Sequence, residues 1–203
     1  MNAFKKFLLK TFNLFYPKKV YGLNNIPEGG ALFAGNHLSA LDPIMRLDIY
    51  NKDAFILAKK EIFKCKLVGA VVKAYGGIPI DRQKPDIQSL LKAVKVLKTN
   101  KKLIVFPEGT RNKTKTDKIQ QIKGGTGVFA VKSKCPIVPI IALKKPRIFI
   151  KNSYLIGKPF YLDAFYGKKL DDAVIQEIDE MITKKMVETQ IELKNLVGGK
   201  KNK

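Results

Sequence analysis

Short apolar segments alternate with amphipathic ones along most of this chain, and this alternation limits the fold more than any other feature. The apolar segments have the length of strands, which we expect at residues 31–35, 54–58, 77–80, 103–106 and 137–143. Helical spacing of apolar residues predicts helices between them, over residues 43–50, parts of 60–75, 86–99 and 125–134. Because strands separated by helices pair in parallel, we expect an α/β fold: a single domain with a largely parallel mixed sheet flanked by helices.

The two ends of the chain depart from this alternation. Near the C-terminus, residues 147–150 and 154–156 are predicted to pair as a hairpin, and residues 171–196 to form a long amphipathic helix. We divide the chain into an N-terminal amphipathic helix, a globular domain and a basic tail, at residues 1–18, 19–197 and 198–203.

The chain is strongly basic, with 39 Lys and Arg against 17 Asp and Glu and a formal net charge of +22. Such a charge attracts polyanions, which include nucleic acid, an anionic membrane surface and an acidic or phosphorylated partner. Cys65 and Cys135 form no paired motif, which argues against a disulfide framework and against zinc. No apolar run reaches the roughly 18 residues of a membrane-spanning helix.

The N-terminal helix allows two interpretations. Its apolar residues recur at helical spacing, so it can pack on the core of its own domain or lie in the headgroup layer of a membrane. The first 20 residues contain five lysines and no acidic residue, and this favours an anionic membrane surface.

His37 is the one histidine of the chain, and it directly follows the apolar segment 31–35. Strand ends are where α/β proteins place their chemistry, although a lone histidine there is more often structural. Asp42 follows five residues later and precedes Pro43, a pattern typical of a helix N-cap. The same carboxylate can fold back across the turn and orient the imidazole for proton transfer, so Asp42 can serve both roles.

Four segments resemble the signatures of the glycerolipid acyltransferases, the family of the lysophosphatidate and glycerol-3-phosphate acyltransferases. The first is Asn36-His37 with Asp42-Pro43. The others follow in the family's order, as Gly-Ile-Pro-Ile-Asp-Arg at 77–82, Phe-Pro-Glu-Gly-Thr-Arg-Asn at 106–112 and Ile-Val-Pro-Ile at 137–140. The similarity runs from about Tyr21 to about Gly157, and the segment 106–112 is its most specific part.

This resemblance implies a glycerol-3-phosphate acyltransferase-like fold, in which His37 and Asp42 are catalytic. It also implies a glycerophosphate site at Glu108, Gly109, Thr110 and Arg111. An arginine can grip a phosphate through its planar fork, and Arg82 and Lys59, each just after a predicted strand, can add further cations. Glu108 can either hold the arginines or accept a hydrogen bond from a substrate hydroxyl.

The function expected from the resemblance is transfer of an acyl group from acyl-CoA or acyl-acyl-carrier protein to the sn-2 hydroxyl of 1-acyl-sn-glycerol-3-phosphate. Glycerol-3-phosphate or another lysophospholipid is the alternative acceptor, and a non-enzymatic basic protein that binds membrane or nucleic acid is the alternative of another class. We expect no metal or other cofactor and no nucleic acid partner, because no nucleic-acid motif accompanies the charge. The expected location is peripheral, on the cytoplasmic face of the cell membrane.

Overall fold

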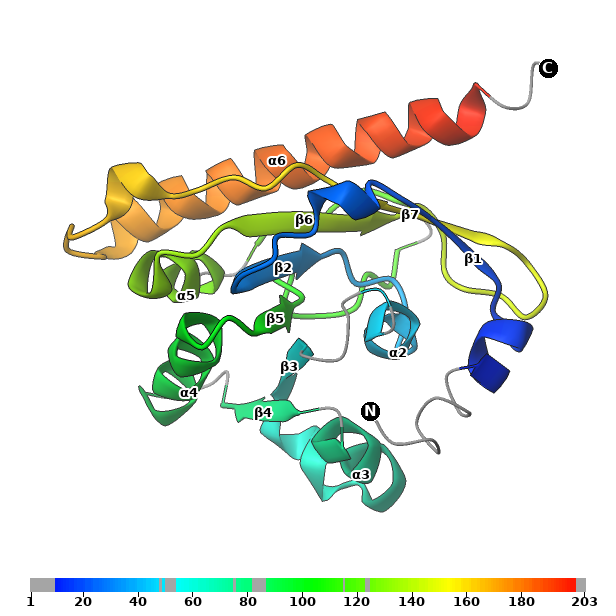
Figure 1. Ribbon diagram of the computed structural model, residues 1–203, viewed down its shortest axis with the longest axis horizontal. Helices are drawn as coiled ribbons and strands as arrows, with labels where there is room; N and C mark the ends of the chain where they lie inside the picture. Colours follow the sequence, from blue (N-terminus) through cyan, green and yellow to red (C-terminus); the bar gives the residue numbers. More distant parts are fainter. Residues whose placement is uncertain are drawn as a thin grey trace.

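The computed structural model describes residues 10–47, 49, 54–74, 76–81, 87–114, 116–122 and 125–199. A seven-stranded sheet with the order β1-β7-β6-β2-β5-β3-β4 forms its centre (Figure 1). The strands are β1 (Lys18–Tyr21), β2 (Ala31–Gly35), β3 (Ala54–Lys59), β4 (Gly77–Ile80), β5 (Lys102–Val105), β6 (Ile137–Ala142) and β7 (Asn152–Ile156).

The directions of the strands determine which strand ends lie at the same edge of the sheet. Strands β6, β2, β5, β3 and β4 pair in parallel, whereas β7 is antiparallel to β6 and β1 is parallel to β7. The carboxyl ends of the first group therefore lie at the same edge as the starts of β7 and β1. This mostly parallel sheet confirms the predicted α/β class.

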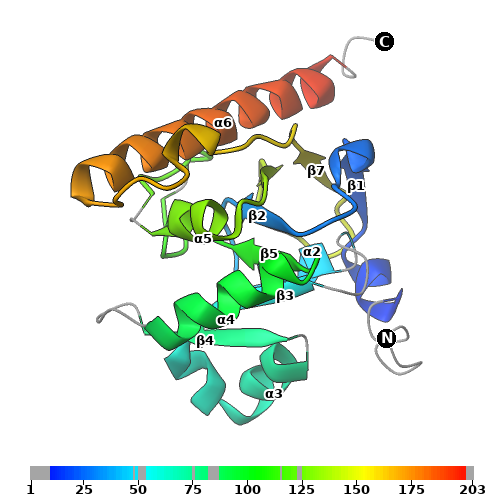
Figure 2. The same ribbon diagram turned by 60° about the vertical axis from the view of Figure 1, so that its left-hand side comes forward.

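Helices cover both faces of the sheet. The helices α4 (Ile87–Lys98), α5 (Thr126–Ser133) and α6 (Asp172–Gly198) share one apolar cluster, and α2 (Asp42–Leu47) packs in the cluster on the other face. α3 (Lys66–Ala74) lies beside β4, next to the short 3-10 helix Lys60–Lys64 (Figure 2). The strand β2 is buried on both sides, because Leu32 and Ala34 belong to the first cluster and Ala31 and Phe33 to the second. A strand covered on both faces is expected to be apolar throughout, as β2 is.

The predicted hairpin is wrong in its first strand. Residues 147–150 form a turn in which the Ile150 N–H donates to the Arg147 carbonyl at 3.2 Å. Phe149 has φ 60, a left-handed conformation that interrupts an extended strand. β7 instead pairs with β6 and with β1, a strand that the sequence did not predict.

The predicted N-terminal helix lies partly outside the described residues, which begin at residue 10. Residues 10–15 are helical, and β1 starts at Lys18. Phe12 stacks on Tyr16 at a centroid distance of 4.7 Å, and both rings pack against the core, whereas Leu14 and Phe15 are exposed. Among the described residues, no helix combines the length and the apolar composition that crossing a bilayer requires.

The carboxylate of Asp179, on α6, is predicted to lower the stability of the protein when it is charged. Burial raises the pKa of Asp179 from 3.8 to about 6, and its Oδ1 has no hydrogen-bond partner among the described residues. Because the pKa in the folded protein is the higher one, the charged form costs stability. This cost is absent below about pH 4 and complete above about pH 6.

We expect Asp179→Asn to stabilise the protein at pH 8 by about 1 kcal/mol after allowance for solvent screening, or about 2–4 °C in Tm. At pH 4 the wild type and Asp179→Asn should have the same Tm, because Asp179 is then protonated in the folded protein. Thermal melts at both values test this, with Glu177→Gln on the same helix as an exposed control. An equal gain at pH 4 and pH 8 would contradict the expectation.

Candidate active site

The carboxyl ends of three neighbouring strands are joined by side-chain hydrogen bonds. Asn36, the residue after β2, donates from Nδ2 to the Ala142 carbonyl at 2.8 Å and accepts the Ala142 N–H at 3.0 Å. This buried amide therefore ties β2 to the end of β6. On the other side, the loop after β5 binds the backbone of His37 through Glu108 and Asn112.

His37 and Asp42 form a hydrogen-bonded pair. His37 Nδ1 lies 3.1 Å from Asp42 Oδ2, and the same oxygen accepts the N–H groups of Leu38 and Ser39, each at 2.6 Å. The Asp42 carboxylate is fully buried, whereas 18% of the His37 side chain is exposed. The carboxylate thus folds back from the first turn of α2 onto the residues that precede it. It holds both the imidazole and its loop.

Phe106 and Glu108 fix His37 from the β5 side. The Phe106 ring stacks on the imidazole with a centroid distance of 4.4 Å. Glu108 accepts the His37 N–H at Oε1 (2.8 Å) and the Gln120 N–H at Oε2 (3.3 Å), and the residue is 1% exposed. The two roles that the sequence left open for Glu108, holding the arginines or accepting from a substrate hydroxyl, stay predictions, and these bonds add a third role. They show it holding the main chain of the histidine.

The loop from Phe106 to Asn112 closes around the histidine. Gly109 has φ 71, which favours glycine, and its N–H donates to the Phe106 carbonyl at 3.0 Å. The Asn112 N–H donates to the His37 carbonyl at 2.7 Å, so both backbone groups of His37 are bound by this loop.

The other predicted site residues that the structure describes lie at the end of β3 or in the loop after β5. Lys59 ends β3 and is exposed, and Thr110 and Arg111 are exposed in the loop after β5. Arg82 lies outside the described residues. Next to it in the sequence, Asp81 pairs with Lys60 at 2.5 Å. The structure thus brings His37, Asp42 and Glu108 into contact, and it leaves Lys59, Thr110 and Arg111 open to solvent.

This arrangement can perform general base chemistry. A carboxylate accepts the proton on Nδ1, which leaves the lone pair of Nε2 for a hydroxyl proton. The buried carboxylate also stabilises the imidazolium that forms.

Sequence reasoning gave no role to Asn36, Phe106 and Asn112, although all three lie within the quoted signatures. Asn36 and Asn112 are polar and almost fully buried, at 1% and 2% exposure. Buried polar groups need hydrogen-bond partners. For Asn36, its position directly after an apolar strand was therefore a usable signal, but it does not say which strand supplies the partner.

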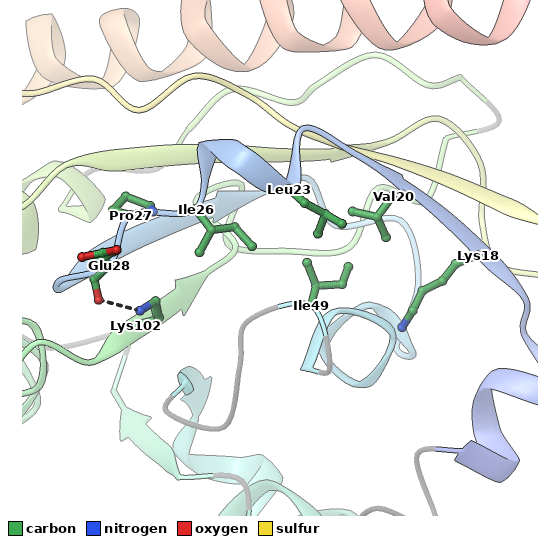
Figure 3. Close-up of a pocket in the computed structure, with 8 residues that line it drawn as sticks. All are labelled: Lys18, Val20, Leu23, Ile26, Pro27, Glu28, Ile49 and Lys102. Carbon is green, nitrogen blue, oxygen red and sulfur yellow. Dashed lines mark hydrogen bonds between the residues drawn. The ribbon is translucent and has the colours of Figure 1, made fainter.

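A groove of about 730 Å³ lies on the face of the sheet that α2 covers, on the other side from α6 (Figure 3). Four apolar side chains line it together with Pro27 and Glu28, namely Val20, Leu23, Ile26 and Ile49. Its two lysines bind main-chain carbonyls: Lys18 Nζ donates to Met45 and Lys102 Nζ to Glu28. None of the described residues that line it belongs to the predicted site.

A family model identifies the protein family of this chain. The model of the family described as "Acyltransferase" matches residues 18–142. The chain belongs to the acyltransferase family. The match includes all of the predicted site residues, from His37 to Arg111.

Two curated relatives of this acyltransferase-family protein are named 1-acyl-sn-glycerol-3-phosphate acyltransferase. The protein of Bacillus subtilis strain 168 is 32% identical over 151 residues, which are 70% of this chain and 73% of the relative. The protein of Borreliella burgdorferi is 30% identical over 136 residues, which are 66% of this chain and 54% of the relative. The chain thus spans about half of the Borreliella relative.

A solved structure supports the fold. The crystal structure of the 1-acyl-sn-glycerophosphate acyltransferase PlsC from Thermotoga maritima superposes with a TM-score of 0.65 at 23% identity. The superposition covers 94% of this chain and 84% of that one.

Proposed function

We propose that this protein transfers a fatty acyl group to the sn-2 hydroxyl of 1-acyl-sn-glycerol-3-phosphate and so produces phosphatidic acid. The bond between His37 and a buried Asp42 at the carboxyl edge of the sheet carries the proposal, because it forms a poised general base. The names of the relatives support the choice of acceptor. The acyl donor is acyl-CoA or acyl-acyl-carrier protein, which enters as a co-substrate, and no other cofactor takes part.

In the proposed reaction, Nε2 of His37 takes the hydroxyl proton while the acceptor oxygen attacks the thioester carbonyl. Asp42 stabilises the resulting imidazolium. The tetrahedral intermediate then collapses, the carbon–sulfur bond breaks and the thiolate leaves. The imidazolium returns its proton to that sulfur, so the products are the ester and the free thiol. The acceptor alcohol is itself the nucleophile, and Ser39 has no covalent role.

Cations around the dyad are proposed to bind the acceptor phosphate. Lys59, Arg82 and Arg111 supply the charge, and the loop at Gly109 and Thr110 lets backbone and hydroxyl approach the headgroup. Held by its phosphate, the acceptor keeps its hydroxyl near the histidine, which lowers the entropic cost of the encounter. Glu108 acts through His37 as a positioning residue.

Arg111→Ala is expected to raise the KM for the lysophosphatidate acceptor by about 10- to 100-fold, because a charge-assisted hydrogen bond is lost. The change in kcat should be much smaller. Arg111→Lys should fall between, since it keeps the charge without the fork. Initial rates over a range of acceptor concentrations test this, with the exposed Lys132→Ala on α5 as control. An unaltered KM in Arg111→Ala would remove the residue from the phosphate site.

The overall proposal is tested by a panel of acceptors and donors. The purified protein is incubated with lysophosphatidate, glycerol-3-phosphate or lysophosphatidylcholine, each with acyl-CoA or acyl-acyl-carrier protein. We expect phosphatidic acid to be the main product, from lysophosphatidate. Preference for another acceptor would move the proposal to that substrate. Absence of turnover in every combination would favour a non-enzymatic basic protein.

We also propose that the protein works as a peripheral protein at an anionic membrane surface, on the cytoplasmic side. The net charge of +22 supports this. Both the acceptor and the product are lipids, so a surface location brings the enzyme to its substrate.

A further inference from the structure

Exposed apolar side chains gather where the loop between β6 and β7 meets the helical residues 10–15. Leu14 is 71% exposed and Phe149 is 70% exposed, and Phe15, Ile148 and Ile150 are exposed as well. We call these residues the apolar tip: Leu14, Phe15, Ile148, Phe149 and Ile150. Figure 1 shows the two segments beside each other, at one end of the sheet. Large apolar side chains exposed together mark interaction sites.

The apolar tip is held in place by its own contacts. The Phe149 N–H donates to the Phe15 carbonyl at 2.7 Å, and the two rings lie 5.7 Å apart between centroids. The loop returns to the sheet at Asn152, whose N–H donates to Pro17 at 2.9 Å and whose Nδ2 donates to Ile150 at 3.0 Å. Segments far apart in the sequence therefore present their apolar side chains as one unit.

Phe149 combines an unfavourable backbone conformation with an exposed ring. Its φ of 60 is uncommon for a residue other than glycine, and a bulky side chain makes it more so. Its ring is also mostly in water. Strained backbone of this kind is found at functional positions, where the side chain must be presented in a set direction.

Basic residues lie in the same two segments as the apolar tip, and we call them the basic rim. They are all exposed: Lys10, Lys144, Lys145, Arg147 and Lys151. The segments 10–19 and 143–151 contain no acidic residue. An apolar tip with a basic rim matches the chemistry of an anionic bilayer, with acyl chains beneath a layer of phosphates.

The tip is also connected to the edge of the sheet that carries the dyad. The loop leaves β6 directly after Ala142, and Ala142 is bonded in both directions to Asn36, the neighbour of His37. A lipid surface that holds this loop therefore lies on the side of the sheet where His37 is found.

We propose that the apolar tip inserts into the headgroup layer of an anionic bilayer while the basic rim binds lipid phosphates. The insertion turns the edge of the sheet with His37 toward the lipid that it uses. The role given to this orientation rests on the proposed function, but the insertion itself is measured without turnover.

A single tryptophan tests the insertion, because the chain contains none. Phe149→Trp is mixed with vesicles of phosphatidylglycerol and phosphatidylcholine, and with vesicles whose acyl chains carry bromine as a quencher. We expect a blue shift of the emission and quenching by the brominated chains. The control is Ile191→Trp, at an exposed position on α6, whose emission should change little. Equal responses at the two positions, or no response at Phe149→Trp, would overturn the proposal.

A second variant measures the contribution to binding. Phe149→Asn removes the ring and keeps a residue that tolerates the left-handed backbone. It should weaken binding to the anionic vesicles by about tenfold, the scale of one large apolar side chain, whereas Ile191→Asn should leave binding unchanged. Thermal melts confirm that both variants fold. Unchanged vesicle binding in Phe149→Asn, with weaker use of acyl-acyl-carrier protein, would instead assign the surface to the acidic carrier and refute insertion.

The proposed acyl transfer and the proposed membrane insertion can be disproved independently of each other. A protein that inserts but does not turn over substrate would retain the membrane surface and lose the proposed reaction. A protein that turns over a monomeric short-chain lysophosphatidate at the same rate in Phe149→Asn, without any vesicle binding in either form, would retain the reaction and lose the surface.

Discussion

Replacement of His37 by alanine is expected to lower kcat by about 10³-fold, the usual scale for loss of a general base. The imidazole is bonded to a buried carboxylate and is itself partly open to solvent. Without it, nothing positioned by Asp42 can accept the proton of the acceptor hydroxyl. The measurement is single-turnover and steady-state transfer to lysophosphatidate, at saturating donor and acceptor.

The fold should survive this change, because the bonds that shape the loop use the His37 backbone. Its N–H donates to Glu108 and its carbonyl accepts from Asn112, and both remain in the variant. Near-native circular dichroism and a Tm within a few degrees are expected for His37→Ala, at about 2–4 °C per kcal/mol. His37→Gln, which keeps a polar side chain without a basic nitrogen, should be equally inactive. A variant of either kind with near-normal kcat would disprove the mechanism.

Asp42→Asn is expected to lower kcat by about 10²- to 10⁴-fold with little change in acceptor KM. The amide oxygen can replace Oδ2, which accepts from His37, Leu38 and Ser39. The charge that stabilises the imidazolium is lost. The amide nitrogen would take the place of Oδ1, which is buried without a partner among the described residues, so a stability loss of about 1–3 kcal/mol should accompany the change.

Comparison with Asp42→Ala separates catalysis from loop structure. Alanine leaves the N–H groups of Leu38 and Ser39 without their acceptor, so this variant should melt clearly below Asp42→Asn. If Asp42 only shaped the loop, kcat would follow Tm through the series from wild type to asparagine to alanine. We expect instead that Asp42→Asn already loses most of the activity while it keeps most of the loop.

Local sequence patterns were sufficient to predict much of the sheet. The strands β2 and β4 were predicted with the bounds that the structure has, because an apolar run between turn residues depends little on its partners. β1 was missed, since Lys18-Lys-Val-Tyr21 has no local strand signal and becomes a strand by pairing with β7, more than 130 residues away in the sequence. The segment 147–150 was misassigned for the converse reason. Its residues suit a strand, but β7 takes its partners elsewhere and Phe149 turns left-handed.

The sequence by itself determined the α/β class, the lone histidine with a carboxylate five residues on, and the signatures that place the chain in its family. These features are written in short segments, where spacing and residue type carry the information. Only the tertiary structure decided that Glu108 holds the backbone of His37, that Asn36 ties β2 to β6, and that Phe15 meets Phe149. Each of these contacts joins segments from different strands or loops, and the packing of the sheet, rather than any local pattern, brings their atoms within hydrogen-bonding or ring-contact distance.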